Sequence, residues 1–177
     1  MSDNIDGTLF EAAGAGDEAL VGQLIDQATV DWRDEMDWTA LHEAADGGHP
    51  PVVTRLLDAG WSLEARSEYT GRTPLSYAAE AGHLETVKCM LIRGANMDTQ
   101  NDDKRTPLHY ASSNGHSKVI KRAEGHTEMI KTLLHCGANQ QIRNDQGQTA
   151  EDAAKNDETR AVFREFSKKK INIKEEV

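Results

Sequence analysis

The sequence repeats itself with a period close to 33 residues, and this repetition constrains the fold more than any other feature. Four similar segments begin at Thr39, Thr73, Thr106 and Thr149, separated by 34, 33 and 43 residues. In the first three, a Gly-His step, a pair of apolar residues and a further glycine follow in the same order. A chain made of repeated units of this length folds as a linear stack in which each unit contacts only its neighbours.

Each unit has the pattern of two short antiparallel helices. In the unit that starts at Thr73-Pro74, the threonine is an N-cap and the proline suits the first helical turn. Ala78-Ala79 permits close packing of the first helix, and Gly82-His83 ends it. A second helix follows with apolar residues at helical spacing over 87–91, and Gly94 ends that helix. One such pair cannot bury its apolar faces alone, so the units are predicted to stack.

These features together resemble the ankyrin repeat, whose signature T-P-L-H-x-A is present as Thr106-Pro107-Leu108-His109-Tyr110-Ala111. The resemblance extends over residues 5 to 166, approximately, and implies an all-α solenoid of helix-turn-helix pairs with β-hairpin or loop connections. We expect one domain over residues 1–166, with units at about 5–36, 37–69, 70–102, 103–145 and 146–166, and a flexible charged tail over 167–177. The first and last units are expected to cap the stack. In the last unit, Glu151 stands where inner units have a leucine, and a charged residue at that position suits an outermost layer that meets water.

The unit over 103–145 is ten residues too long. Its segment 115–121 is echoed by 125–131, which indicates a local duplication with the excess between about 116 and 125. We expect either a basic bulge between the two helices or one or two additional helical turns. Because lengthening a surface segment costs little free energy, the insertion is either tolerated without consequence or a contact for a partner.

Two loop glycines of the repeat pattern are replaced. Asp37 and Lys104 stand where other units have Gly71 and Gly147. Glycine is favoured at positions with positive φ, so these two loops are predicted to be reshaped or slightly strained.

The negative charge is concentrated in the first part of the chain. The net charge is −10, yet residues 1–50 hold twelve acidic residues against one basic residue, whereas residues 51–177 hold eighteen against nineteen. The acidic part is either a solvated face or a patch that steers a partner with a basic surface. The acidic balance argues against direct nucleic-acid binding. With no signal-like or membrane-spanning segment, we expect a cytoplasmic and/or nuclear protein without membrane contact.

No motif for catalysis, metal binding or a cofactor is present. The P-loop, dinucleotide-binding, zinc-protease and nucleophile-elbow patterns are all absent. Six of the seven histidines fall at repeat-fixed positions and are expected to form structural hydrogen bonds. His135 lies beside Cys136, but no third residue is spaced to orient them. We therefore predict a non-enzyme without metal or cofactor, with Cys89 and Cys136 as free thiols.

The ankyrin resemblance implies binding of another protein on the concave surface formed by loop tips and the exposed faces of the first helices. We expect an adaptor, inhibitor or recruiting subunit that is a monomer by itself. The alternative is a regulatory or substrate-recruiting subunit of an enzyme or transcription complex, without its own catalysis or DNA contact. The candidate partner-binding residues are Glu35, Met36, Trp38, Asp46, Tyr69, Arg72, Glu80, Asp103 and Arg105.

Aromatic side chains at the loop tips are the candidate anchors, because Trp, Tyr and Arg dominate the energetics of many interfaces. Trp38 and Tyr69, together with Met36, either face solvent or pack against the neighbouring loop. Arg72 pairs either with a partner carboxylate or with Glu80. We expect interior packing for four other aromatic residues, namely Trp32, Trp61, Tyr77 and Tyr110.

Overall fold

Nine helices follow one another along the residues that the computed structural model describes, 4–114 and 120–175. Within this part of the chain, the only β contact outside the helices is an isolated antiparallel bridge between Arg33 and Thr39. The predicted all-α class is therefore confirmed. The helices are α1 (Ile5–Ala15), α2 (Glu18–Leu24), α3 (Ala40–Gly47), α4 (Pro50–Asp58), α5 (Pro74–Ala81), α6 (Leu84–Ile92), α7 (Pro107–Asn114), α8 (Ile120–His135) and α9 (Asp157–Glu175).

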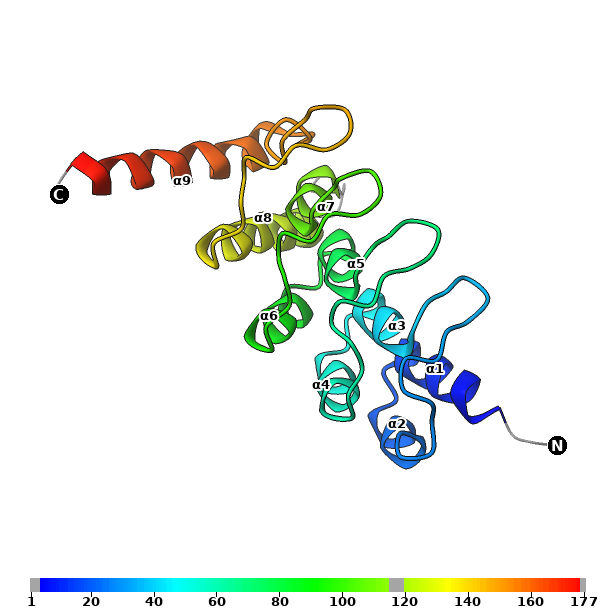
Figure 1. Cartoon of the computed structure of the whole chain (residues 1–177). Helices are drawn as coiled ribbons and strands as arrows, with labels where there is room; N and C mark the ends of the chain where they lie inside the picture. The colour runs from blue at the N-terminus through cyan, green and yellow to red at the C-terminus, as the bar shows by residue number, and fades with distance from the viewer. Residues whose placement is uncertain (1–3, 115–119, 176–177) are drawn as a thin grey trace.

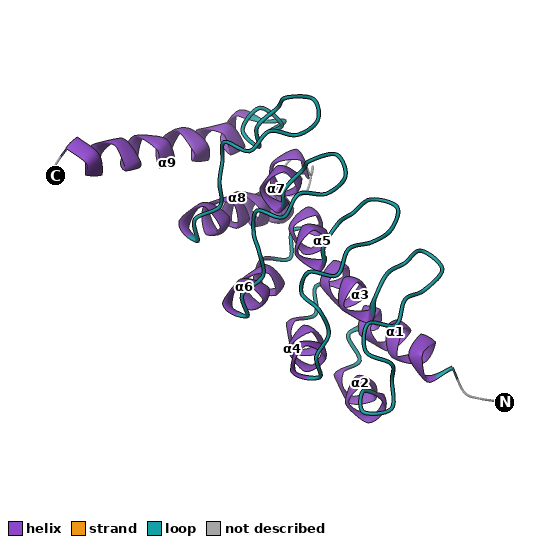
Figure 2. Ribbon diagram, viewed as in Figure 1, coloured by secondary structure: helices purple, strands orange, loops and turns teal. Residues whose placement is uncertain are grey.

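The helices form two parallel rows, as the predicted solenoid requires (Figure 1). The first row is α1, α3, α5 and α7, and each of these helices packs on the next. The second row is α2, α4, α6 and α8, packed in the same successive manner. The long loops that join one pair to the next project side by side along the first row (Figure 2).

The helix boundaries follow from capping chemistry within each unit. The Thr39 N–H donates to Nδ1 of His42 over 3.1 Å in a capping box at the start of α3. The same bond joins the Thr106 N–H to Nδ1 of His109 over 3.2 Å at the start of α7. Gly48 adopts a left-handed conformation with φ of 76° and ends α3, because glycine has no Cβ to oppose positive φ.

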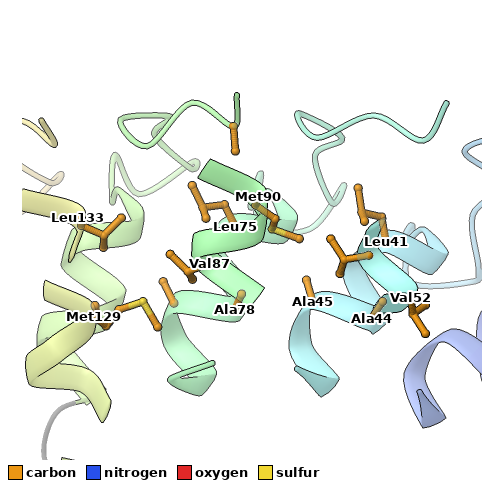
Figure 3. Close-up of a cluster of buried hydrophobic side chains, with 14 of the residues drawn as sticks. Leu41, Ala44, Ala45, Val52, Leu75, Ala78, Val87, Met90, Met129 and Leu133 are labelled. Atoms are coloured by element: carbon orange, nitrogen blue, oxygen red, sulfur yellow. The ribbon is translucent and has the colours of Figure 1, made fainter. Parts of the chain in front are cut away.

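A continuous apolar core runs along the stack between the two rows. Figure 3 shows Leu41 and Leu75 of successive first helices with Met90 and Leu133 of successive second helices. All four side chains are buried. Pairs of small residues, such as Ala44-Ala45, let the first helices approach closely while the larger residues fill the space beside them.

Histidines in the Gly-His steps tie each unit to the preceding one. The Nε2 atoms of His49, His83 and His126 donate to the carbonyl oxygens of Gly14, Asp46 and Glu80, over 2.9, 2.8 and 3.1 Å. Each acceptor lies at or near the end of the first helix in the preceding unit. The predicted structural role of these histidines is thereby confirmed.

The insertion lengthens the second helix of its unit. α8 has 16 residues, whereas α4 and α6 have nine each. His126, in the second copy of the duplicated Gly-His step, makes the bond to the preceding unit. The prediction of additional helical turns agrees with the start of α8 at Ile120. The predicted basic bulge and His116 fall partly or wholly on residues 115–119, which lie outside the described residues.

The last unit differs from the inner ones. Turns over 150–153 take the place of its first helix, and Glu151 is partly exposed with an oxygen 3.7 Å from Nε of Arg164. The final helix, α9, continues to Glu175, beyond the boundary at 166 where we expected the chain to fray (Figure 1). The reason is compositional, because residues 157–175 contain no glycine or proline and many strong helix formers.

Candidate functional site

The loops between units share one local design. In the loop over 99–106, the Asn101 N–H donates to the Arg105 carbonyl over 2.9 Å, and the Lys104 N–H donates to the Asn101 carbonyl over 2.9 Å. Lys104 and Asp37 have φ of 59° and 61°, close to the 63° of Gly71. The loops thus keep the same turn without glycine, so the predicted reshaping is wrong, and Asp37 and Lys104 adopt the positive φ that the alternative of slight strain implies.

Neighbouring loops are fastened to one another. The Asp102 N–H donates to the Thr70 carbonyl over 3.2 Å, and the Asp145 N–H donates to the Asp103 carbonyl over 3.0 Å. Nη1 of Arg33 donates to the Arg66 carbonyl over 2.8 Å. The row of loops is therefore ordered before any partner arrives, which lowers the entropic cost of binding.

Two large apolar or aromatic side chains protrude from adjacent loops. Met36 is 62% exposed and Tyr69 is 72% exposed. Three acidic candidates, Glu35, Asp46 and Asp103, are exposed as well. Met36 and Tyr69 thus expose a large apolar surface to water on the loop row.

Trp38 is partly buried against the next unit. Its ring centroid lies 4.3 Å from that of Tyr77 and 6.1 Å from that of His42. Of the two alternatives for Trp38, packing against its neighbours therefore fits better than exposure to solvent. Trp61 is buried, and Trp32 meets Phe10 edge-on at 6.0 Å, so both take part in interior packing as predicted.

Arg72 is held inside the loop row and is not free to meet a partner. Its guanidinium carbon lies 4.1 Å from the ring centroids of both Tyr77 and Tyr110, and its Nη2 pairs with Glu80. The Arg72 side chain is 13% exposed. The expected pair with Glu80 is thus present, but it is mostly enclosed, because aromatic rings cover both faces of the cation. Tyr77 and Tyr110 are buried between units, as predicted.

Burial keeps the polar groups beneath the loops neutral. Desolvation lowers the pKa of His42 to about 4 and also lowers the pKa of His109. Burial likewise raises the pKa of the Tyr110 hydroxyl, which accepts a hydrogen bond from Nδ2 of Asn101 over 2.9 Å. These groups are interior hydrogen-bonding residues near neutral pH.

Arg105 borders a groove at the end of the loop row. The groove has a volume of about 520 Å³. Its lining includes two further cations, Lys155 and Arg160, that were not among the residues predicted from the sequence. The remaining lining residues are Ser113, Gln148, Asp152, Ala153 and Ala154.

The described residues contain no group of three or more His, Cys, Asp or Glu side chains close enough to hold a metal ion. Nδ1 of His135 pairs with the Lys131 carbonyl over 2.7 Å, and Cys89 and Cys136 are free thiols. None of the helices in the described ranges is both long and apolar enough to cross a membrane.

A family model described as ankyrin repeats, in three copies, matches three overlapping stretches of the chain. These stretches are residues 9–101, 63–122 and 86–175. Together they cover nearly the entire chain.

Several known proteins are similar to parts of the chain. A transient receptor potential cation channel subfamily A member 1 homolog from Caenorhabditis elegans is 38% identical over 98 residues, which is 54% of this chain and 8% of that protein. The B-cell lymphoma 3 protein homolog of Mus musculus is 35% identical over 82 residues, 44% of this chain and 18% of that protein. The ankyrin repeat and KH domain-containing protein 1 of Homo sapiens is 44% identical over 88 residues, 49% of this chain and 4% of that protein. The similarity thus spans less than a fifth of each of these relatives.

Proposed function

Because the chain belongs to the ankyrin-repeat family, we propose that it binds another protein along its row of loops and first helices, as an adaptor, inhibitor or recruiting subunit. Ankyrin repeats are generally protein–protein interaction modules and generally have no catalytic activity. In this proposal the chain acts by stoichiometric binding and catalyses no reaction.

The observation that carries the proposal is the pair of protruding side chains on the loop row. Met36 and Tyr69 are 62% and 72% exposed, on loops that are already fastened by backbone hydrogen bonds. A rigid aromatic residue offers large contact area at a low entropic cost, and a methionine adapts its shape to the partner. Enclosing the two side chains in an interface would remove their apolar surface from water.

The charge around the two side chains indicates the kind of partner. Glu35 lies next to Met36, and Glu68 lies next to Tyr69, and both glutamates are exposed. Asp46 adds a third exposed carboxylate at the end of α3. We therefore propose that the partner presents a basic surface to this end of the row, because complementary charge raises the association rate.

The test compares partner capture by three versions of the tagged chain. The double variant Met36→Ala, Tyr69→Ala removes both protruding side chains. The matched control is Ile92→Ala, which removes an apolar side chain that is 85% exposed on α6, away from the loops. Proteins captured from lysate are quantified by mass spectrometry, and the affinity of each recovered partner is then measured by calorimetry.

Loss of one specific partner from the double variant alone is the expected result. Truncating two central interface residues should weaken binding by roughly thirtyfold or more. A partner that is retained by the double variant but lost from the Ile92→Ala control would refute the proposed surface. Thermal melting of all three proteins establishes that the substitutions leave the fold intact.

A further inference from the structure

Arg72 and Arg105 occupy the same position in successive units, each directly before the threonine that starts a first helix. Around Arg72, three groups complete the site. Tyr77 and Tyr110 cover the two faces of the guanidinium at 4.1 Å, and Glu80 pairs with it. This arrangement neutralises the cation with a carboxylate and shields it with aromatic rings.

The corresponding site around Arg105 lacks two of these three groups. Ser113 stands at the position of Glu80, and Ala153 stands at the position of Tyr110. Both replacements are small, and both line the groove of about 520 Å³ beside Arg105. The groove therefore occupies the region where the repeated pattern would place a carboxylate and a ring.

The guanidinium of Arg105 is left without an ionic or hydrogen-bonding partner among the described residues. Its Nε atom is buried and makes no hydrogen bond there. Nε of Arg72 is buried in the same way, but Nη2 of Arg72 has Glu80. Arg105 is partly buried, and a partly buried cation without a counter-charge is costly, so Arg105 favours a carboxylate that enters the groove.

The rest of the lining strengthens the positive potential. Lys155 and Arg160 line the groove together with a single carboxylate, Asp152. One oxygen of Asp152 already accepts the N–H and the hydroxyl of Thr149, over 3.0 and 2.9 Å. These bonds lower the pKa of the Asp152 carboxyl, so it is ionised, and the bonded oxygen is already engaged by Thr149 at the start of the turns over 150–153. Nη1 of Arg160 already lies 3.2 Å from an oxygen of Asp157, so Arg105 and Lys155 are the two groove cations without an ion pair among the described residues.

We propose that this groove binds a carboxylate side chain from an acidic segment of the partner protein, which takes the place that Glu80 has beside Arg72. The inference rests on the proposed function, because it names a second contact on the same row of loops. It also predicts the orientation of the bound partner along the row of loops. A basic part of the partner lies over Glu35 and Asp46, and an acidic part lies over Arg105 at the other end.

The test is a titration of the ¹⁵N-labelled chain with short peptides, followed through the Nε–Hε resonance of Arg105. The probe is the capped peptide Gly-Glu-Gly-Glu-Gly, and its controls have glutamine or phosphoserine in place of glutamate. We expect a saturable shift of the Arg105 resonance with the glutamate peptide alone. The Arg72 resonance is an internal reference, because Glu80 already occupies the corresponding place.

A substitution in the chain tests whether a carboxylate placed beside Arg105 competes with the peptide. Ser113→Glu rebuilds the Arg72–Glu80 arrangement around Arg105, so it should weaken peptide binding by about tenfold or more. The matched variant Ser113→Gln has the same size without the charge and should retain binding. Both variants place a residue of the size of Glu80 at the equivalent position of α7, and melting curves establish that they fold.

Several outcomes would overturn the proposal. An equal shift with the glutamine peptide would mean that charge is not recognised, and binding of the phosphoserine peptide alone would mean that the groove takes phosphate instead. A shift with rising protein concentration and no peptide would identify a second copy of the chain as the occupant. Unchanged affinity in Ser113→Glu would place the peptide elsewhere.

The titration needs neither the natural partner nor Met36 and Tyr69. Failure of the peptide to bind, with partner capture still dependent on Met36 and Tyr69, would therefore overturn the groove alone. Binding of the peptide in the Met36→Ala, Tyr69→Ala variant, with partner capture unaffected by that variant, would overturn the loop contact alone.

Discussion

Acidification should destabilise the fold through His42, a buried imidazole that has to remain neutral. The Thr39 N–H donates to Nδ1 of His42 over 3.1 Å, so that nitrogen is the acceptor and carries no proton. The proton is on Nε2, which donates to the Arg72 carbonyl over 3.3 Å. Protonating Nδ1 would remove the acceptor that caps α3 and would place a charge in an enclosed site.

The expected magnitude follows from the pKa of His42 in the two states. Burial lowers it from 6.5 to about 4 in the native protein, so the unfolded chain binds a proton in a range where the native imidazole does not. The contribution of the neutral His42 to the free energy of unfolding is therefore complete above about pH 6.5, and it is lost as the pH falls towards about 4. From one titrating group, the free energy of unfolding should fall by about 2 kcal/mol between pH 7.5 and pH 5, and by about 3 kcal/mol near pH 4.

The assay is urea denaturation followed by circular dichroism, on the wild-type chain and on His42→Gln, at pH 7.5 and pH 5. Glutamine does not titrate, and it can accept the Thr39 N–H in the capping-box arrangement. Subtracting the variant from the wild type removes the contributions of all other titrating groups, including His109. His135→Gln is the control for removing an imidazole from an exposed site.

The expected result is a difference in stability between wild type and His42→Gln that shrinks by about 2 kcal/mol between the two pH values. A difference that stays constant with pH would refute the reasoning. So would an NMR titration in which the His42 imidazole takes up its proton near pH 6.5, because the native and unfolded states would then bind protons alike.

Two further substitutions test the loop row. Arg72→Met removes the cation between Tyr77 and Tyr110 while retaining a long side chain. It should lower the free energy of unfolding by roughly 1–2 kcal/mol in urea titrations. An unchanged free energy of unfolding would show that the stacked cation contributes nothing. Lys104→Gly relieves a positive φ of 59° and should raise the melting temperature by about 2–4 °C, a gain of about 1 kcal/mol, whereas Lys104→Ala should not.

The repeated motifs predicted the fold because each helix carries its own boundary signals. Thr39 and His42 cap α3 at one end and Gly48 ends it at the other, all within one short segment. The bond from each Gly-His step to the preceding unit was also predictable, because the histidine recurs at a fixed position. α9 was predicted too short, because the repeat pattern set its end and the unbroken run of helix formers after residue 166 was given less weight.

The candidate site was less predictable, because its contacts join side chains from different units. Arg72 meets Tyr110 across 38 positions of sequence, so the pattern within one unit gives no sign that it is enclosed. The half-buried state of Trp38 likewise depends on Tyr77 of the next unit. A position-by-position comparison of the units, which places Ser113 against Glu80, was the signal that would have pointed to Arg105.

The bonds from the Gly-His steps have a consequence for how this protein tolerates changes of length. His49 and His83 reach back across 35 and 37 positions, whereas His126 reaches back across 46, yet all three end on a carbonyl at the equivalent place. The rise from one unit to the next is therefore independent of the number of residues between the bonded atoms. Segments of different length grafted immediately before Gly125 should leave the alignment of the loops on either side unchanged, so chain length and stack geometry are separate variables in this molecule.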